Sequence, residues 1–339
     1  IDIFANPNFS LFQQFQNWFA NKKFQQKPIL YCTTDTSCIF VNKQREWFSA
    51  NFELTIPSNE IITTYNTKGF AEIDAKIHGL KIPKSRKIEK QIDIQYILNN
   101  FIFPVIIKPT TAQAKKTIDF KTKIFHKKKA FEQFFNSNNQ LLNNIICQEF
   151  IPGKDENVYY YLFYRNKKGE LFENIGIKTL QSPPGAGIMA KGITKYNETI
   201  SKTSRVFLEK INYNGIGGIE YKEFDGEYYF IEMSTRAEGF ILISEMSNVP
   251  ISKIAYHDLS GIPTEHKLKQ IDKIKYIDLL AAFSASKKSK NIFRFLLETI
   301  SAIFDRNTHV NILTLNDVKP FLIYTKRYLN ESKKIFKRR

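Results

Sequence analysis

Two glutamates near the middle of the chain have the spacing that would bring them together in a β-hairpin. The segment Gly217–Arg236 reads GGIEYKEFDGEYYFIEMSTR, and its Asp225-Gly226 pair is typical of a turn between antiparallel strands. Glu220 and Glu232 would then lie on neighbouring strands among aromatic and aliphatic residues. Buried carboxylates need a partner, and a hard cation such as Mg²⁺ suits them. The alternative is a solvated hairpin face that carries surface charges.

The register of this hairpin decides between the two interpretations. A two-residue loop at the turn pairs Glu220 with Ile231, which leaves the two glutamates on opposite faces. A three-residue loop with a bulge changes the parity and places them on one face. The metal hypothesis therefore predicts a bulge at the turn. Glu232, Ser234 and Arg236 alternate along the second strand, so these three side chains share a face.

Two lysines have positions that would suit contacts with phosphate. The apolar strand Phe103–Lys108 (FPVIIK) ends in a lysine whose ammonium the sheet would hold in place, although lysines commonly end strands. Lys178 precedes the loop QSPPGAG, Gln181–Gly187, and suits contacts with a transferring phosphoryl group. The alternative for Lys178 is an ordinary solvent-facing side chain.

A third strand ends in a motif that would suit a nucleoside. In the segment Gln148–Gly153 (QEFIPG), extended backbone offers a donor and an acceptor to an adenine edge. A carboxylate that follows closely, Asp155 or Glu156, would suit a ribose hydroxyl. Without its neighbours the motif is better explained as a strand that stops at a Pro-Gly turn.

The elements around these residues predict a mixed α/β protein. Up to about residue 66, helices alternate with short strands in the manner of half a parallel α/β unit. After helices at Lys68–Gly79 and Glu89–Asn99 we expect strands at Phe103–Lys108, Lys121–His126 and Asn144–Phe150, with a helix at Lys129–Asn136. The run Val158–Tyr164 is apolar without alternation, which fits a strand buried on both faces. From about Pro263 onward the sequence predicts helices and is basic.

Composition narrows the function classes. The chain has 339 residues, of which 42% are hydrophobic, and no stretch approaches the roughly 20 apolar residues of a membrane span. The first ten residues lack the features of a signal peptide, and three unpaired-looking cysteines favour a reducing cytoplasm. The net charge of +17 reflects either compositional drift or an anionic partner. No nucleic-acid-binding module accompanies it, so nucleic acid is not an expected partner.

The ordered combination FPVIIKP, QEFIPG, Lys178 with PPGAG, and the acidic hairpin resembles the ATP-binding region of the ATP-grasp family. Within that family it is most similar to the D-aspartate ligase and carbamoyl-phosphate-synthase-like group. The resemblance runs from about Lys27 to beyond Gly261, and Asp317–Leu322 (DVKPFL) is similar to a late segment of the group. It implies an α/β (α+β) ATP-grasp fold with ATP and Mg²⁺ as cofactors.

The resemblance also implies a role for each candidate residue. Lys108 and Lys123 match the two strand lysines that contact ATP phosphates. The adenine hinge would comprise Gln148, Glu149, Phe150 and Ile151, and the ribose carboxylate would be Asp155 or Glu156. Glu220, Glu232 and Ser234 match the magnesium ligands, and Arg236 and Lys178 match residues that act on the carboxylate and the γ-phosphate. The family usually has Asn where this chain has Ser234, and a hydroxyl is a shorter-reaching ligand.

Three regions follow from this interpretation. Residues 1–66 would form part of a pre-ATP-grasp α/β domain, and residues 67–262 the ATP-grasp domain, with lobes at about 67–149 and 150–262. Residues 263–339 would form a helical, basic C-terminal region. The implied activity is ATP-dependent ligation of a small-molecule or peptide carboxylate to an amine through an acyl phosphate. The alternatives are an Mg-ATP-binding protein without ligase activity and a binder of nucleic acid or of an anionic membrane surface, through the basic tail Lys333–Arg339.

Overall fold

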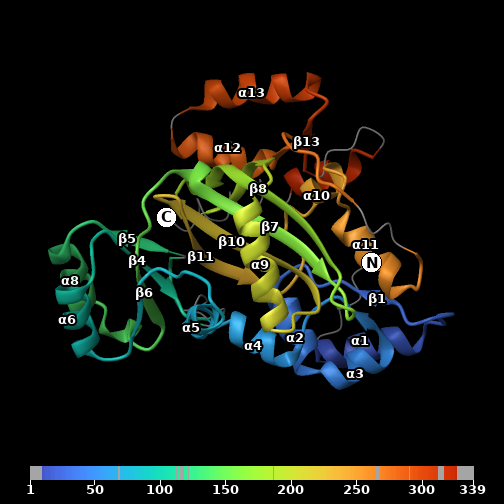
Figure 1. Ribbon diagram of the computed structural model, residues 1–339, viewed down its shortest axis with the longest axis horizontal. Coiled ribbons are helices and arrows are strands. Elements are labelled where there is room, and N and C mark those ends of the chain that lie inside the picture. The colour runs from blue at the N-terminus through green and yellow to red at the C-terminus, as the bar shows by residue number, and fades with distance from the viewer. Residues whose placement is uncertain are drawn as a thin grey trace.

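The computed structural model describes residues 10–67, 69–111, 114, 118–120, 122–185, 187–263, 268–289, 291–311 and 317–326. Three sheets organise these residues, with two, four and seven strands. Figure 1 shows the seven-stranded sheet in the centre, the four-stranded sheet to one side and the N-terminal helices below. None of the described helices is long and apolar enough to cross a membrane.

The N-terminal region is a small α/β unit around a parallel strand pair, as the alternating pattern predicted. Phe12, Phe15, Phe19, Trp47 and Phe48 pack against one another and form much of its core. Its elements are α1 (Leu11–Ala20), β1 (Ile29–Leu30), α2 (Asp35–Lys43), α3 (Arg45–Asn51), β2 (Glu53–Leu54) and α4 (Asn59–Tyr65).

The four-stranded sheet has the order β3-β6-β4-β5, and every pairing in it is antiparallel. Helices α6 and α8 cover one face, where Phe131 and Phe135 are fully buried (Figure 1). The elements are α5 (Phe70–Ile77), β3 (Ser85–Ile88), α6 (Gln91–Asn100), β4 (Val105–Pro109), β5 (Lys123–Phe125), α8 (Lys128–Asn136), the 3₁₀ turn η1 (Asn139–Leu141) and β6 (Ile145–Glu149). The sequence had not predicted β3.

The seven-stranded sheet has the order β11-β10-β7-β8-β9-β12-β13. Its elements are the 3₁₀ turn η2 (Asp155–Asn157), β7 (Val158–Arg165), β8 (Leu171–Ser182), β9 (Ile188–Thr194), α9 (Glu198–Lys210), β10 (Gly215–Phe224), β11 (Glu227–Ser234), α10 (Leu242–Met246), α11 (Ile251–Leu259), β12 (Lys275–Ile277), α12 (Leu279–Lys288), α13 (Ile292–Phe304) and β13 (Thr308–Val310).

Strand β7 is buried on both faces, as its unbroken apolar run predicted. Tyr159, Tyr161 and Phe163 face the core under α5 and α9, and the alternate residues Tyr160 and Leu162 face the core under α10 and α11. This two-sided burial explains the absence of polar alternation, because neither face of the strand meets water. Both layers of helices are therefore packed against the same central sheet.

The C-terminal region differs from the prediction of helices alone. Two three-residue strands, β12 and β13, extend the central sheet, with β12 antiparallel to β9 and parallel to β13. Strands this short leave almost no periodicity in the sequence, which explains why they were missed. The division of the chain into three domains stays a prediction.

Candidate functional site

The hairpin of β10 and β11 places Glu220 directly opposite Glu232. The turn itself is a tight two-residue loop that pairs Phe224 with Glu227, with φ of 53° at Asp225 and 75° at Gly226. The predicted bulge at the turn is therefore wrong in position. The register instead shifts between Glu220 and Tyr221, where Ile231 is the extra residue. This internal bulge produces the parity change that the metal hypothesis requires, and both carboxylates lie on one face.

The Glu220 carboxylate lies in a buried and charged environment. Lys178, whose side chain is 1% exposed, donates a hydrogen bond to Glu220, whose side chain is 17% exposed. Burial raises the pKa of Glu220, and the charges of Glu232 and Glu238 raise it further against the opposing effect of Lys178. Glu220 and Glu232 therefore face each other beside the Lys178 ammonium, and the raised pKa of Glu220 indicates that added positive charge would be favoured here.

The same face of β11 continues beyond its last paired residue. Ser234 lies opposite Gly218 and its hydroxyl donates to Glu238. Arg236 donates through Nε to Asp35 at 2.8 Å and contacts the Glu238 carboxylate at 3.3 Å. The N-terminal unit therefore supplies a carboxylate, at the first residue of α2, that holds the guanidinium of Arg236 in position.

Lys108 lies at the end of β4 and is buried. Its Nζ donates to Gln148 Oε1 at 2.7 Å, and Gln148 Nε2 donates in turn to Glu72 Oε1 at 3.0 Å. Gln148 was predicted as part of an adenine hinge, but its side chain instead positions Lys108. Glu72 belongs to α5, which also contacts β11, so this chain of hydrogen bonds connects the two larger sheets.

The backbone at the end of β6 has the extended form that the hinge prediction requires. The amides of Glu149 and Phe150 donate to the carbonyls of Lys84 and Pro104. Within the part of the chain that the structure describes, the amide of Ile151 donates to no backbone carbonyl. The Glu149 carboxylate accepts a hydrogen bond from the amide of Ile102 at 2.9 Å, which fixes the end of the strand. The amide of Ile151 is therefore the hinge amide that is available to a ligand.

Lys222 was not predicted and lies in the same region. It is buried two residues after Glu220, and its Nζ lies 4.4 Å from the centroid of the Phe150 ring. Burial lowers the pKa of Lys222, and the Asp155 charge partly offsets that effect. The alternation along β10 would have placed Lys222 on the face of Glu220, so the sequence did contain the pattern that identifies it.

Lys123 lies on the wrong face for its predicted role. It pairs with Ile107, not with Lys108, and successive residues of a strand point to opposite faces. Its ammonium therefore lies on the side of α8, 4.1 Å from the centroid of the Phe134 ring. The prediction for Lys123 is therefore wrong, because Lys123 lies opposite Ile107 and shares its face of the sheet, whereas Lys108 points to the other face.

Asp155 and Glu156 do not line the cavity beside the predicted hinge. Asp155 accepts hydrogen bonds from the amides of Gln181 and Gly185, at 2.7 and 2.8 Å, and from the Gln181 side chain at 2.9 Å. It therefore anchors the loop that follows β8 and is not placed to hold a ribose. Glu156 lines a separate cavity under α12 and α13, of about 840 Å³.

Two adjoining cavities bring most of the candidate residues together. The hinge cavity, about 90 Å³, is lined by residues that include Lys108, Gln148, Glu149, Phe150, Ile151 and Lys222. The carboxylate cavity, about 420 Å³, is lined by residues that include Asp35, Lys178, Ser234, Arg236 and Glu238. Glu220, Ile231 and Glu232 line both, so a ligand that starts at the hinge reaches the carboxylate pair. Of these two cavities, the carboxylate cavity has a volume within the range of small-ligand sites, roughly 300–1,000 Å³, and the hinge cavity is smaller.

Metal binding at this hairpin must rest on no more than two carboxylates, because larger groups of metal-binding side chains are not found in the part of the chain that the structure describes. Among the described residues, no group of three or more His, Cys, Asp or Glu side chains could hold a metal ion. Mg²⁺ commonly binds through one or two carboxylates together with substrate phosphates, and Glu220 and Glu232 fit that arrangement. Glu238 was missed, although it continues the alternation of Glu232, Ser234 and Arg236. The basic tail, Lys333–Arg339, lies outside the described residues.

Comparison with solved structures identifies the architecture. N5-carboxyaminoimidazole ribonucleotide synthetase in its ADP complex superposes with a TM-score of 0.60 at 13% identity, over 76% of this chain and 66% of that one. L-amino acid ligase from Bacillus licheniformis superposes with a TM-score of 0.58 at 15% identity, over 80% and 66%. The chain therefore has the ATP-grasp fold, as the resemblance predicted.

In sequence, the chain is similar to D-aspartate ligase from Enterococcus faecium (strain Aus0004), with 28% identity over 189 residues. The match covers 50% of this chain and 44% of that ligase, so the chain spans less than half the length of this relative. No protein-family model matches the sequence.

Proposed function

We propose that this protein is an ATP-dependent carboxylate–amine ligase that activates its carboxylate substrate as an acyl phosphate. The observation that best supports the proposal is the cross-strand pair Glu220 and Glu232, which borders both the hinge cavity and the carboxylate cavity. Residues suited to a nucleoside lie on one side of this pair, and an arginine suited to a carboxylate lies on the other.

Glu220 and Glu232 would hold magnesium, with Ser234 as a further oxygen ligand. When bound, the metal would neutralise phosphate charge and orient the terminal phosphates. The raised pKa of Glu220 supports this role, because burial and neighbouring carboxylates already disfavour its charged form in the absence of a cation. Ser234 would have to turn away from Glu238, to which it donates in the described structure.

The nucleotide would lie along the hinge cavity. The amide of Ile151 is available to the adenine, and the buried ammonium groups of Lys108 and Lys222 would stabilise phosphate charge. Lys178 would contact the γ-phosphate once its pairing with Glu220 is replaced. Preorganised cations of this kind favour the phosphoryl-transfer transition state without the cost of reorganisation during the reaction.

Arg236 would hold the carboxylate substrate, since Asp35 and Glu238 fix its guanidinium at the wall of the carboxylate cavity. A carboxylate oxygen attacks the γ-phosphorus, the bond to the departing ADP breaks, and an acyl phosphate forms. The amine nitrogen then attacks the carbonyl carbon and loses a proton, and inorganic phosphate leaves. Positioning and exclusion of water would provide most of the catalysis.

An amino acid is the substrate class that we propose for this cavity. The two similar ligases are named for D-aspartate and for L-amino acids. Arg236 and the carboxylates of Asp35, Glu238 and Asp278 line the same cavity, which suits a ligand that carries both charges. Magnesium and ATP are available in the cytoplasm, which remains the expected location.

The test is ADP release measured with Mg-ATP against panels of L- and D-amino acids, each with and without a second amine. We expect release that depends on a specific acceptor pair, together with a product whose mass corresponds to loss of water between the two. The Glu232→Gln variant should lose that release and serves as the control for contaminating ATPases. Failure of every pair to raise ADP release above the control would contradict the proposal.

A second candidate function is Mg-ATP binding without ligation, favoured by the Ser234 hydroxyl that is engaged with Glu238. It predicts saturable Mg-ATP binding with no ADP formation, unchanged in Ser234→Asn. Appearance of ADP release in wild-type protein or in that variant would exclude it.

A further inference from the structure

Helix α13 presents apolar side chains on two opposite sides. Phe295 and Ala302 are buried and pack in the cluster that contains Ala281 and Ala282 of α12. On the outer side, Phe293, Leu297, Ile300 and Phe304 are 75%, 54%, 56% and 82% exposed. At 3.6 residues per turn these four positions fall within about 60° of one another, so they form one continuous stripe. We call these four residues the outer stripe.

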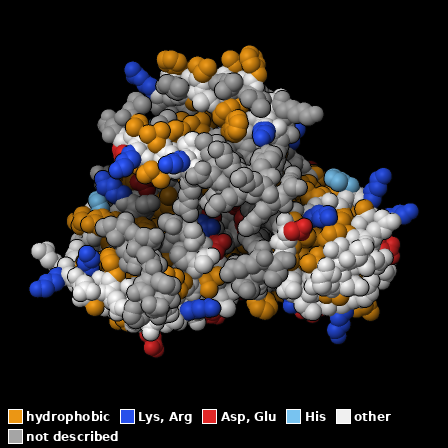
Figure 2. Space-filling model, turned by 180° about the vertical axis from the view of Figure 1, so that it is seen from behind, with side chains coloured by type: hydrophobic (Ala, Val, Ile, Leu, Met, Phe, Trp, Pro, Cys, Tyr) orange, Lys and Arg blue, Asp and Glu red, His pale blue; other side chains and the backbone are white. Residues whose placement is uncertain are grey.

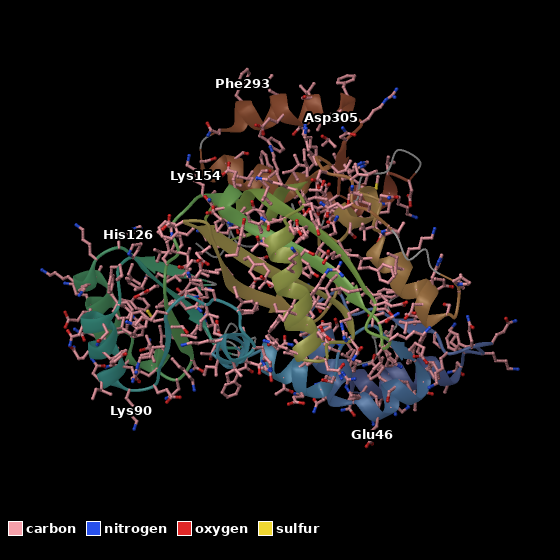
Figure 3. All side chains as sticks on the ribbon, in the orientation of Figure 1. Glu46, Lys90, His126, Lys154, Phe293 and Asp305 are labelled. Carbon is pink, nitrogen blue, oxygen red and sulfur yellow. The ribbon has the colours of Figure 1, made fainter. Side chains whose placement is uncertain are left out.

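The figures show that the outer stripe lies on the outside of the molecule. Figure 3 shows Phe293 pointing away from the rest of the protein at the edge formed by α13. In the view from behind, hydrophobic side chains gather along the same edge (Figure 2). An amphipathic surface helix normally exposes polar residues on its outer side, so an apolar outer side indicates a further partner.

The charges near α13 favour an anionic partner. Glu298, the only acidic residue between 292 and 304, pairs with Lys191 of β9. Asp305, at the end of the helix, pairs with Lys275 of β12 at 2.8 Å. Lys287 before the helix and Arg306 after it are exposed. Both acidic groups are therefore neutralised by lysines of the central sheet, and basic groups lie near both ends of the outer stripe.

We propose that α13 docks this protein onto an anionic lipid surface, with the outer stripe inserted among the lipids and Lys287 and Arg306 at the headgroups. An apolar helix side flanked by basic residues is the arrangement of helices that lie in the plane of a membrane interface. The net charge of +17 adds long-range attraction to such a surface. The inference uses no residue of the proposed ligase site and stands independently of it.

A second copy of the chain fits the outer stripe less well. A stable protein interface buries roughly 800 Å² on each partner. A helix of 13 residues is only about 20 Å long, and a strip about 10 Å wide along it covers about 200 Å². The stripe is therefore too small for a lasting dimer on its own, whereas insertion into lipid needs no matching protein surface.

The test is co-sedimentation of the full chain with vesicles of phosphatidylcholine, alone or mixed with phosphatidylglycerol. We expect binding to the mixed vesicles and little to phosphatidylcholine alone. The double variant Phe293→Ser/Phe304→Ser should bind at least about tenfold more weakly, because two aromatic side chains no longer leave water. Phe and Ser have similar helix propensities, so the helix should persist.

The matched control is Ile77→Ser/Ile92→Ser, which changes two side chains exposed to 73% and 71% on α5 and α6. This variant should bind as the wild type does. Equal binding by the α13 variant and the wild type would overturn the proposal and assign any attraction to the basic charge alone. Light scattering that shows a dimer converted to monomer by the α13 variant would also overturn it. If the double variant loses its melting transition, Leu297→Ser replaces it.

Discussion

Replacing Lys178 by Met tests the charge balance around Glu220. Methionine has nearly the length of lysine without its charge, so the variant removes the ammonium and leaves the packing largely in place. Lys178 is 1% exposed and donates to Glu220, which faces Glu232 across the hairpin. The variant therefore leaves a largely buried carboxylate beside other carboxylates without its identified counter-ion.

The expected cost follows from the geometry. Removal of one member of a buried ion pair costs about 3–5 kcal/mol. The Glu220 side chain retains 17% exposure, so water still screens it and we expect about 2–3 kcal/mol. For a chain of 339 residues that loss lowers the melting midpoint by roughly 3–4 °C. Adding Glu220→Gln to the variant should recover most of the loss, because the double variant has no unpaired charge.

The sign of the pH dependence is fixed by the direction of the Glu220 pKa. That pKa is raised in the folded state, and Lys178 opposes the rise, so its removal raises the pKa further. The neutral Glu220 carboxyl contributes its full stability at pH values below the pKa that it has in the unfolded state. This contribution is lost as the pH rises through the pKa that it has in the folded state. The melting deficit of Lys178→Met should therefore be large at about pH 8 and shrink toward about pH 5.

Thermal melting of the wild type, both single variants and the double variant, with and without Mg-ATP, is the assay. Mg-ATP should stabilise Lys178→Met less than the wild type, because the variant lacks the ammonium that we propose to contact the γ-phosphate. Single-variant effects that simply add in the double variant would refute the reasoning, since they would show that Lys178 and Glu220 do not interact. A midpoint for Lys178→Met equal to that of the wild type at about pH 8 would do the same.

Three further outcomes can be measured. Glu232→Gln should weaken magnesium-dependent ATP binding by about tenfold or more in calorimetry, because one charged ligand is lost; an unchanged affinity would argue against a metal at this pair. Lys108→Ala should weaken ATP binding by a similar factor, because the buried Lys108 ammonium would lose its contact with phosphate. Lys123→Ala should change ATP binding by less than about twofold, since the Lys123 ammonium lies against Phe134 on the opposite face of the sheet. Equal effects of the two variants would contradict the assignment of these lysines to opposite faces. Asp155→Ala should accelerate amide hydrogen exchange at Gln181 and Gly185 by at least about tenfold, because both amides lose their acceptor; slow exchange there would show that the loop is held by other contacts.

The sequence predicted that Glu220 and Glu232 share a face of the hairpin, but it placed the bulge that produces this pairing at the wrong residue. Pairing of Glu220 with Glu232 needed an odd residue in the hairpin, and parity alone established that need. The position of the odd residue at Ile231 was not predictable, because the Asp225-Gly226 pair also suits a regular two-residue turn. A bulge inside the strand depends on packing against neighbouring elements and leaves no local pattern.

The errors at Lys123 and Asp155 have the same origin. A lysine on a three-residue strand can face either way, and its direction depends on which residue pairs with β4. Asp155 belongs to a single 3₁₀ turn, where its carboxylate accepts from amides some thirty residues later in the chain. Lys222 and Glu238 could have been found by extending the alternation by one step on each strand.

The short strands at the edge of the central sheet have a consequence for how new specificities could arise. Asp278 follows β12 and Asn311 follows β13, and both line the carboxylate cavity but not the hinge cavity. The segment that supplies them joins the central sheet where Lys275, Tyr276 and Ile277 of β12 lie opposite Ile193, Gly192 and Lys191 of β9. Recombination that replaces this segment would therefore change one wall of the carboxylate cavity and leave β4 and β10, which carry Lys108 and Glu220, in place. Under the proposed ligase function, exchange of this one segment would give the same activating site a different amine specificity.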